Sequence, residues 1–236
     1  MPLPELPKLS NSLGVTFRDQ NLWREALTHR SYLNEHKEAL WDHNERLEFL
    51  GDAVLELVCT EHLFKLYPDK TEGDLTTYRA ALVNTNTLAL VGARLGLGDY
   101  LLMSRGESKD TGRARQVILA NAVEALIGAV YLDQGFEVSR EFVVHKILSD
   151  LQQTIARELS HDAKSYFQER AQSEESITPT YQLLSETGPD HDKTFTIGLY
   201  LGEKLEAQGA GHSKQEAEQA AARTALAARG WSVSGK

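Results

Sequence analysis

The fold is decided by residues 43–52, which read His43-Asn44-Glu45-Arg46-Leu47-Glu48-Phe49-Leu50-Gly51-Asp52. Within this stretch the carboxylates of Glu45, Glu48 and Asp52 are three or four positions apart, so a helix places them on one stripe. Like charges at this spacing repel each other by about a few tenths of a kcal/mol per exposed pair. A helix that keeps them is expected to hold a cation, and a hard divalent metal ion is the leading candidate. The alternative is a solvated acidic face on an ordinary surface helix.

A second segment, residues 117–132, is apolar on nearly every side, which is typical of a helix buried inside an α-helical domain. Its two interior polar residues, Asn121 and Glu124, lie on one face at i, i+3. An unpaired carboxylate in such a helix would be costly or would stay protonated. Glu124 could therefore pair with an arginine such as Arg46, or it could share a metal ion with the carboxylates of the first helix. The shared metal explains more of the residues.

Composition places the chain among soluble globular proteins of one or two domains. It has 236 residues, of which 41% are hydrophobic and 25% charged. The single cysteine, Cys59, cannot form an internal disulfide and is expected in the core. With no secretory signal or membrane span evident, a cytoplasmic protein that does not use a membrane is expected. The net charge of −9 argues against a generic nucleic-acid binder, so any polyanion must meet a local basic surface or helix ends.

The pattern of residues divides the chain into two predicted domains. Residues 1–158 read as successive helices with short connectors, including a helix capped by Thr71 with Asp74 three residues later. Residues 161–230 read as a helix, three antiparallel strands and a helix. The predicted elements of this second domain are a helix over 162–172, strands over 180–184, 194–201 and 204–209, and a helix over 213–228.

Both halves resemble ribonuclease III. The N-terminal half resembles its endonuclease domain through residues 43–52 and three other segments: Thr28-His29-Arg30-Ser31-Tyr32, Arg79-Ala80-Ala81-Leu82-Val83-Asn84 and the run from Glu124 to Asp133. The C-terminal half resembles a double-stranded RNA-binding domain through Gly188-Pro189, His191, Ser213-Lys214 and the run from Ala217 to Ala222. The resemblance implies a multidomain fold of class α and α+β. An all-helical endonuclease domain is followed by an α-β-β-β-α RNA-binding domain.

The family resemblance also implies a function. The protein is expected to be a homodimer, formed through the endonuclease domain, that cuts both strands of double-stranded RNA. Magnesium is the implied cofactor, manganese can substitute, and the products carry 5′-phosphates and short 3′ overhangs. Precursors of rRNA and mRNA are the implied substrates. The competing hypothesis is a scaffold of the same fold that binds double-stranded RNA without cleaving it.

Residues of this chain that match the family's motifs are expected to have the roles that the family gives those positions. Glu48 is expected to be a metal ligand, Asp52 a catalytic carboxylate that holds a metal-bound water, and Glu124 both an essential acid and a ligand. Glu45 and Glu72 match acidic positions near the dimer cleft with supporting roles in cleavage. For Glu72, a carboxylate favoured by the helix dipole is an equally good interpretation. Magnesium prefers oxygen ligands and keeps several waters, so two or three carboxylates suffice.

Asn121 departs from the family pattern, which usually has aspartate as a metal ligand at this position. An amide oxygen can still coordinate magnesium but brings no charge. Losing an anion beside a divalent ion costs about a few kcal/mol at an effective dielectric near 20. Weakened metal binding and slow cleavage are therefore expected. Asn121 is either a natural variant with compensation elsewhere, or a deliberate substitution that traps substrate or metal.

The second domain offers candidate RNA contacts that read duplex shape. Gln168 and Gln172, at i, i+4, are expected to reach one minor groove and His191 the other. Ser213 and Lys214 begin the last helix, where N–H groups and the helix dipole favour a phosphate. Ordinary surface polarity for the glutamines and pure capping for Ser213 are the alternatives. The family often has a second lysine directly after Lys214; its absence predicts modest affinity and a shallow salt dependence.

Overall fold

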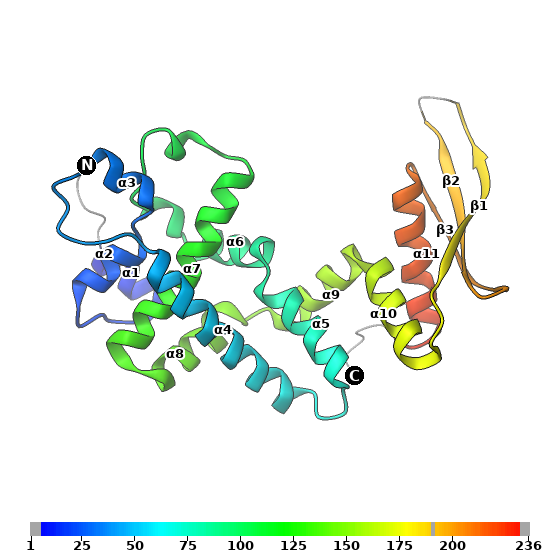
Figure 1. Cartoon of the computed structure of the whole chain (residues 1–236), viewed down its shortest axis with the longest axis horizontal. Coiled ribbons are helices and arrows are strands. Elements are labelled where there is room, and N and C mark those ends of the chain that lie inside the picture. The colour runs from blue at the N-terminus through cyan, green and yellow to red at the C-terminus, as the bar shows by residue number, and fades with distance from the viewer. Residues whose placement is uncertain (1–5, 190–191, 232–236) are drawn as a thin grey trace. The chain divides into compact units, whose positions relative to one another are not determined.

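The chain forms two compact units, which are described separately. The computed structural model describes residues 6–189 and 192–231, without the side chains of residue 6 and residues 158–161. The first unit spans Met1–Leu151 and the second spans Gln152–Lys236. Figure 1 shows helices alone in the first unit and helices with a sheet in the second. The predicted fold class, an all-helical domain followed by an α-β-β-β-α domain, is confirmed.

The first unit is built from α-helices joined by short turns. Its described residues form no strand, and their one β-bridge joins Thr28 and Leu102. A π-helical segment, η3 (Val143–Ile147), follows the last α-helix of the unit. The α-helices are α1 (Leu6–Leu13), α2 (Gln20–Ala26), α3 (Arg30–Glu35), α4 (Glu45–Leu66), α5 (Glu72–Val83), α6 (Thr85–Arg94), α7 (Arg113–Gln134) and α8 (Phe136–Phe142). The 3₁₀ turns are η1 (Leu97–Asp99) and η2 (Glu107–Lys109).

Helices α4 and α7 cross with their backbones in contact (Figure 1). A Cβ atom added at Gly51 of α4 would lie 1.7 Å from the carbonyl oxygen of Glu124, and one at Gly128 of α7 would lie 2.3 Å from that of Leu47. Neither position has room for a side chain. Glycine at both sites therefore lets the two helices approach more closely than any side chain at these positions would allow.

The start of α4 is fixed by the end of α2. The buried Asn44 donates its backbone N–H to the Thr28 carbonyl (2.9 Å) and its side-chain amide to the Ala26 carbonyl (3.4 Å). Trp41 donates its indole N–H to the Thr28 hydroxyl at 3.0 Å. Asn44 therefore makes no side-chain cap on α4, and its side chain instead joins two segments of the unit. These bonds set where Glu45 begins the helix.

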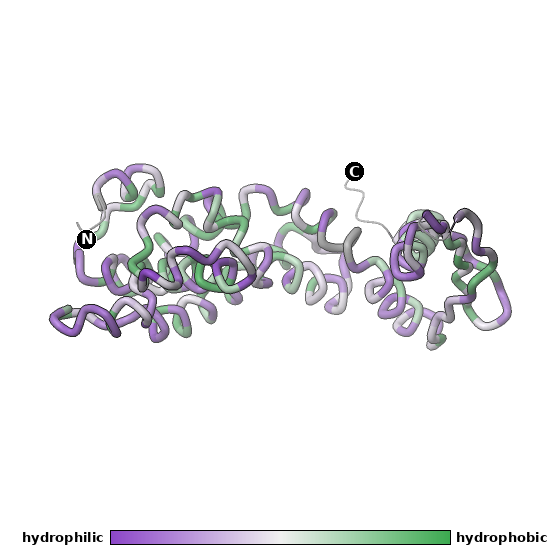
Figure 2. The backbone as a smooth tube through the Cα atoms, turned by 90° about the horizontal axis from the view of Figure 1, so that it is seen from above, coloured by the Kyte–Doolittle hydropathy of each residue, from purple (hydrophilic) through white to green (hydrophobic). Residues whose placement is uncertain are grey.

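Helix α7 forms the centre of the first unit. Val123, Ala125, Leu126 and Ile127 are fully buried. Within the described residues it is the one helix long and apolar enough to span a membrane, but more than half of the relevant window is buried inside the protein, as in a core helix. Figure 2 shows hydrophilic and hydrophobic segments alternating along the helices of both units, the pattern of elements with one buried and one exposed face.

The second unit has the predicted order of helix, three strands and helix. The strands form an antiparallel sheet in the order β1-β2-β3. β1 extends three residues past the predicted end because a bulge at Leu184 lets pairing with β2 resume. The elements are α9 (Leu151–His161), which begins at the boundary, α10 (Ala163–Glu175), β1 (Thr180–Thr187), β2 (Thr194–Leu201), β3 (Lys204–Gly211) and α11 (Lys214–Ala228).

Helix α11 covers one face of the sheet at close range. A Cβ atom added at Gly209 of β3 would lie 2.0 Å from the backbone nitrogen of Ala221, so only glycine fits beneath the helix. Lys164 ties α10 to α11, because its ammonium lies 2.6 Å from the Glu218 carboxylate and its backbone N–H donates to Gln219 at 3.1 Å. The second unit is therefore held by both apolar packing and polar links between its helices.

The close crossing of α4 and α7 predicts that adding one methyl group at Gly51 destabilises the protein. Gly51→Ala should lower the free energy of unfolding by about 3 kcal/mol or more, because the new Cβ overlaps backbone that cannot move aside. Urea unfolding followed by circular dichroism measures this loss.

Gly106→Ala is the matched control, since the nearest atom to its added Cβ is 3.8 Å away and its φ of −68° suits any residue. A change within about 0.5–1 kcal/mol is expected there. Equal effects of the two substitutions would contradict the tight crossing.

Candidate active site

The crossing of α4 and α7 brings four sequence-predicted residues into one neighbourhood. Glu48 and Asp52 flank Gly51 on α4, while Asn121 and Glu124 lie on the facing side of α7. Burial and the charge of Glu45 raise the pKa of Glu48, and the side-chain amide of Asn121 opposes them.

Glu124 experiences the strongest effect of this neighbourhood. Burial, together with the negative charges of Asp52 and Glu48, raises the pKa of Glu124 to about 7. No cationic side chain opposes these effects, so the predicted alternative of an ion pair with Arg46 has no support in the electrostatics of Glu124. Three carboxylates thus share a partly buried region whose negative charge is not balanced by the protein.

The donor set of this region suits a hard divalent cation. Carboxylate and amide oxygens are the ligands that magnesium accepts, and it keeps several waters besides. Among the described residues, however, no three His, Cys, Asp or Glu side chains converge closely enough to form a complete binding group.

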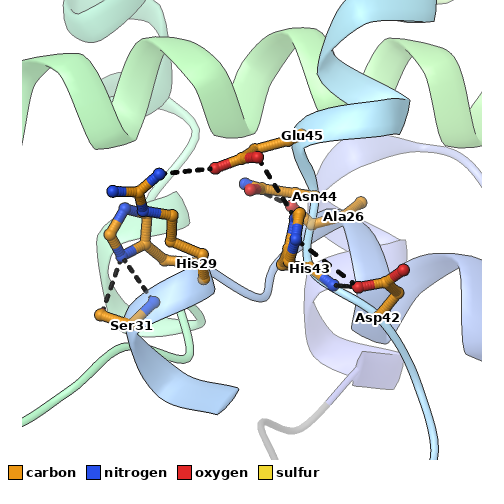
Figure 3. A network of polar contacts seen from close by, with 8 residues as sticks. Ala26, His29, Ser31, Asp42, His43, Asn44 and Glu45 are labelled. Carbon is orange, nitrogen blue, oxygen red and sulfur yellow. Dashed lines mark hydrogen bonds and ion pairs between the residues drawn. The ribbon is translucent and has the colours of Figure 1, made fainter. Parts of the chain in front are cut away.

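Glu45 lies beside two basic side chains that sequence reasoning missed. Figure 3 shows its carboxylate beside His43, with Asp42 on the other side of that ring. The Glu45 carboxylate lies 3.5 Å from the Arg30 guanidinium and 3.8 Å from Nδ1 of His43. His29 meanwhile uses its own Nδ1 to accept the Ser31 backbone N–H. The family segments at residues 28–32 and 43–52 thus meet around Glu45.

Glu72 does not join the acidic neighbourhood within one chain. It begins α5 and accepts a hydrogen bond from the Thr76 hydroxyl at 3.0 Å. It lines a hollow of about 360 Å³ together with Thr60 and Phe64 near the far end of α4. Thr60 is eight residues beyond Asp52, or about 12 Å along the helix axis. A role for Glu72 in cleavage stays a prediction, and it requires a second chain.

The outer stripe of α4 is unusually apolar for a surface. Phe49 is 81% exposed, Leu57 57% and Phe64 70%. Their spacing of eight and seven residues places them along one side of the helix. Large exposed apolar patches mark interaction sites more often than ordinary solvent contact. The spacing of these three residues is present in the sequence, but the sequence analysis considered only the carboxylates of this helix and did not predict an exposed apolar surface.

The candidate RNA-binding residues lie on the surface of the second unit. Gln168 and Gln172 are exposed on α10 and line a shallow hollow of about 470 Å³. The Ser213 hydroxyl accepts the Glu216 backbone N–H at 3.1 Å, so its capping role is confirmed, and the exposed Lys214 is the first residue of α11. His191 lies outside the described residues. RNA contact by these residues stays a prediction.

The glycines of the crossing are the structural residues that sequence reasoning overlooked. Gly51 stands between two predicted ligands, and Gly128 follows Glu124 by one helical turn. Both lie inside continuous helices, where glycine costs about 1 kcal/mol relative to alanine. A glycine kept inside a long helix at such a cost is the signal that could have indicated a close helix contact.

Comparison with known proteins supports one family over most of the chain. Residues 19–151 match the family described as Ribonuclease-III-like, and residues 163–228 match the double-stranded RNA binding motif. A Ribonuclease 3 of Desulforamulus reducens is 48% identical over 219 residues, covering 93% of this chain and 89% of that protein. A Ribonuclease 3 of Borreliella burgdorferi is 44% identical over 224 residues, covering 95% and 91% respectively.

A solved structure resembles the first unit. It is the nuclease domain of ribonuclease III from Campylobacter jejuni, described for structural flexibility in a region involved in dimer formation. It is 43% identical and covers 61% of this chain and 97% of that structure, with a TM-score of 0.56. The similarity therefore extends from sequence to the arrangement of helices.

The raised pKa of Glu124 predicts a pH-dependent stability in the absence of metal. Below pH 4.5 the carboxyl is protonated in both the folded and unfolded states and costs nothing. As the pH rises toward about 7 the unfolded state ionises first, so the folded state loses stability, and the loss is complete above pH 7. Glu124→Gln should therefore stabilise the protein in EDTA by about 1–3 kcal/mol at pH 8, allowing for solvent screening.

At pH 5 the same substitution should gain little. Urea unfolding at both pH values measures the difference, with Glu56→Gln, an exposed carboxylate on α4, as the control. An equal gain at pH 5 and pH 8 would contradict the unbalanced charge at Glu124.

Proposed function

The chain belongs to the ribonuclease III family, and from this premise we propose that its endoribonuclease activity on double-stranded RNA resides at the crossing of α4 and α7. The observation that supports this assignment is the partly buried Glu124, whose carboxylate faces Asp52 and Glu48 without a balancing cation. A divalent metal ion, magnesium by preference and manganese as a substitute, relieves this charge. Phosphodiester hydrolysis is the chemistry that such a centre performs.

Each residue of the centre has a separate task in this proposal. Glu48, Asn121 and Glu124 would hold the ion through oxygen atoms, and a bound ion would supply acidification of an attacking water and charge neutralisation at the scissile phosphate. Asp52 is exposed on the same side of α4, where its carboxylate can accept a hydrogen bond from that water and orient it. Glu45, kept in place by Arg30, sits one turn before Glu48 at the edge of the site.

The second unit supplies the proposed contacts to the RNA duplex. Amide groups of Gln168 and Gln172 fit the 2′-hydroxyls and base edges of a minor groove, and the start of α11 at Lys214 fits a phosphate. His191 completes this set in the proposal. We propose products with 5′-phosphates and short 3′ overhangs, precursors of rRNA and mRNA as substrates, and the cytoplasm as the location.

A homodimer formed through the first unit fits the apolar stripe of α4. Phe49, Leu57 and Phe64 expose side chains that a second copy of the chain can cover. The related nuclease domain of Campylobacter jejuni is described with a region involved in dimer formation. Pairing of two copies also provides the second chain that Glu72 needs in order to approach an acidic centre. Two centres in one dimer suit the cleavage of two strands.

The competing function is a scaffold that binds duplex RNA without cutting it. Asn121 favours it, because an amide replaces the charged ligand usual in the family. Glu48, Asp52 and Glu124 all remain and favour the enzyme.

A cleavage assay separates the enzyme from the scaffold. Long double-stranded RNA incubated with the protein and magnesium or manganese should yield discrete short duplexes. Glu124→Gln should slow cleavage by about 100-fold or more, because it removes a charged ligand at the centre. Its RNA affinity, measured by gel shift, should stay within about twofold of the parent protein, since phosphate and groove contacts supply that affinity. Gel shifts without any products from the parent protein would favour the scaffold.

Dimerisation is tested on the exposed stripe. Phe49→Glu should weaken self-association by at least about tenfold, because it would bury an unpaired charge in the interface. The monomer fold should be unaffected, since the Phe49 side chain is 81% exposed. Analytical ultracentrifugation over a concentration series measures the shift, and Leu90→Glu, at a 53% exposed leucine of α6, is the control. Equal behaviour of both variants would place the interface elsewhere.

A further inference from the structure

The chain turns back on itself at the end of α11. Gly230 adopts a left-handed φ of +68°, and its N–H donates to the Ala227 carbonyl at 3.2 Å. Trp231 then donates its backbone N–H to the Leu226 carbonyl at 2.9 Å. These two bonds form a Schellman motif, which ends a helix and returns the next residue toward it. The half-buried Trp231 is therefore held against the second unit.

The indole ring of Trp231 contacts side chains from two helices. The Arg229 guanidinium, at the end of α11, lies 4.8 Å from the ring centroid, and that of Arg170 on α10 lies 5.5 Å from it. The ring of Phe167, which is fully buried on α10, lies 5.4 Å away. An aromatic face attracts a cation, most strongly where water is excluded. These four residues, named here the Trp231 clasp, join the end of α11 to α10.

The guanidinium of Arg229 is itself fixed by two carboxylates. Its Nε and Nη2 atoms each lie 2.9 Å from one oxygen of Glu206 on β3, and Glu175, the last residue of α10, also pairs with it. The Glu206 side chain is 8% exposed and that of Arg229 is 19% exposed. Breaking a pair so far removed from water is costly, because the remaining charge loses its partner. The clasp therefore has a rigid base in the sheet.

The clasp is the second of two attachments between α10 and α11. Lys164 attaches the first turn of α10 through its bonds to α11, and the clasp attaches the second half. Since α10 packs mainly against α11, these attachments determine where Gln168 and Gln172 lie relative to Lys214 at the start of α11. A duplex is recognised by its shape across successive grooves, so contacts from two helices must keep a fixed spacing.

We propose that Trp231 is a positioning residue for RNA binding, because the clasp holds the second half of α10 where Gln168 and Gln172 can meet a minor groove. This inference rests on the proposed RNA contacts of the second unit. It adds to them a residue beyond the segment 163–228 that matches the RNA-binding motif. Without the clasp, α10 samples orientations that do not fit the groove, and the apparent dissociation constant rises as the fitting fraction falls.

The test removes the ring in the full chain with Trp231→Ala. The dissociation constant for duplex RNA, measured by fluorescence anisotropy in EDTA, should rise about fivefold, as expected if about a fifth of the molecules keep α10 in place. Hydrogen exchange of the α10 amides should accelerate, since exchange reports local opening. During cleavage in magnesium, KM should rise while kcat at saturating RNA stays unchanged. Trp231→Phe keeps an aromatic face for the arginines and should stay within about twofold of the parent protein.

Ile197→Val is the matched control for a general loss of stability in the same unit. Ile197 lies on β2, is 3% exposed and belongs to no part of the clasp. Its truncation should lower the melting temperature by about a few degrees while RNA affinity and α10 exchange stay at the parent values. Equal losses of affinity in Ile197→Val and Trp231→Ala would show that stability alone sets RNA binding, and would refute the positioning role.

Failure of the clasp and failure of the RNA contact give different results. Unchanged affinity or unchanged α10 exchange in Trp231→Ala, with a parent protein that binds RNA, would refute the inference. The contact itself is tested by the double variant Gln168→Ala with Gln172→Ala. If that variant binds duplex RNA as the parent does, the proposed contact from α10 is wrong, whatever the exchange of Trp231→Ala.

Discussion

The backbone contact between α4 and α7 is the constraint on which the rest of the first unit depends. Gly51 meets the Glu124 carbonyl, and Gly128 meets that of Leu47, so neither helix can shift without a steric clash. The contact places the carboxylates on either side of Gly51 against the polar face of α7. The acidic neighbourhood is therefore a consequence of main-chain packing. If the two helices could move apart, repulsion between these carboxylates would separate them.

Magnitudes show why the packing prevails over the repulsion. The raised pKa of Glu124 corresponds to at most about 3 kcal/mol of unfavourable charge and desolvation at high pH. Fully burying an aliphatic side chain contributes about 1.5–3 kcal/mol, and α7 buries Val123, Leu126 and Ile127 completely. A few such buried residues along α7 offset the cost of its acidic neighbourhood. The site can thus be electrostatically unfavourable while the helix that carries half of it remains stable.

Local signals in the sequence were sufficient for most of the fold. The alternation of β2 predicted its bounds, 194–201, and the Thr71 cap predicted the start of α5. Contacts between segments far apart in the sequence could not be predicted in the same way, because the spacing of residues within one segment does not show which other segment it will contact. Arg30 reaches Glu45 only after the α2–α3 region folds back on the start of α4. Glu72 begins a different helix, α5, and its position relative to Glu48 and Asp52 could not be predicted, because the spacing along one helix does not determine where another helix lies.

Both units of this acidic chain have neutral amide side chains at candidate functional positions. A net charge of −9 opposes an RNA polyanion, and more carboxylates at the centre would oppose one another. Amides avoid both conflicts, because they donate and accept hydrogen bonds without adding to either repulsion. On α10, the exposed Gln168 and Gln172 line one hollow without adding a charge that would repel phosphate. On α7, the side-chain amide of Asn121 opposes the rise in the pKa of Glu48, whereas an aspartate there would add another negative charge. In both places a neutral amide therefore limits the negative charge of the chain.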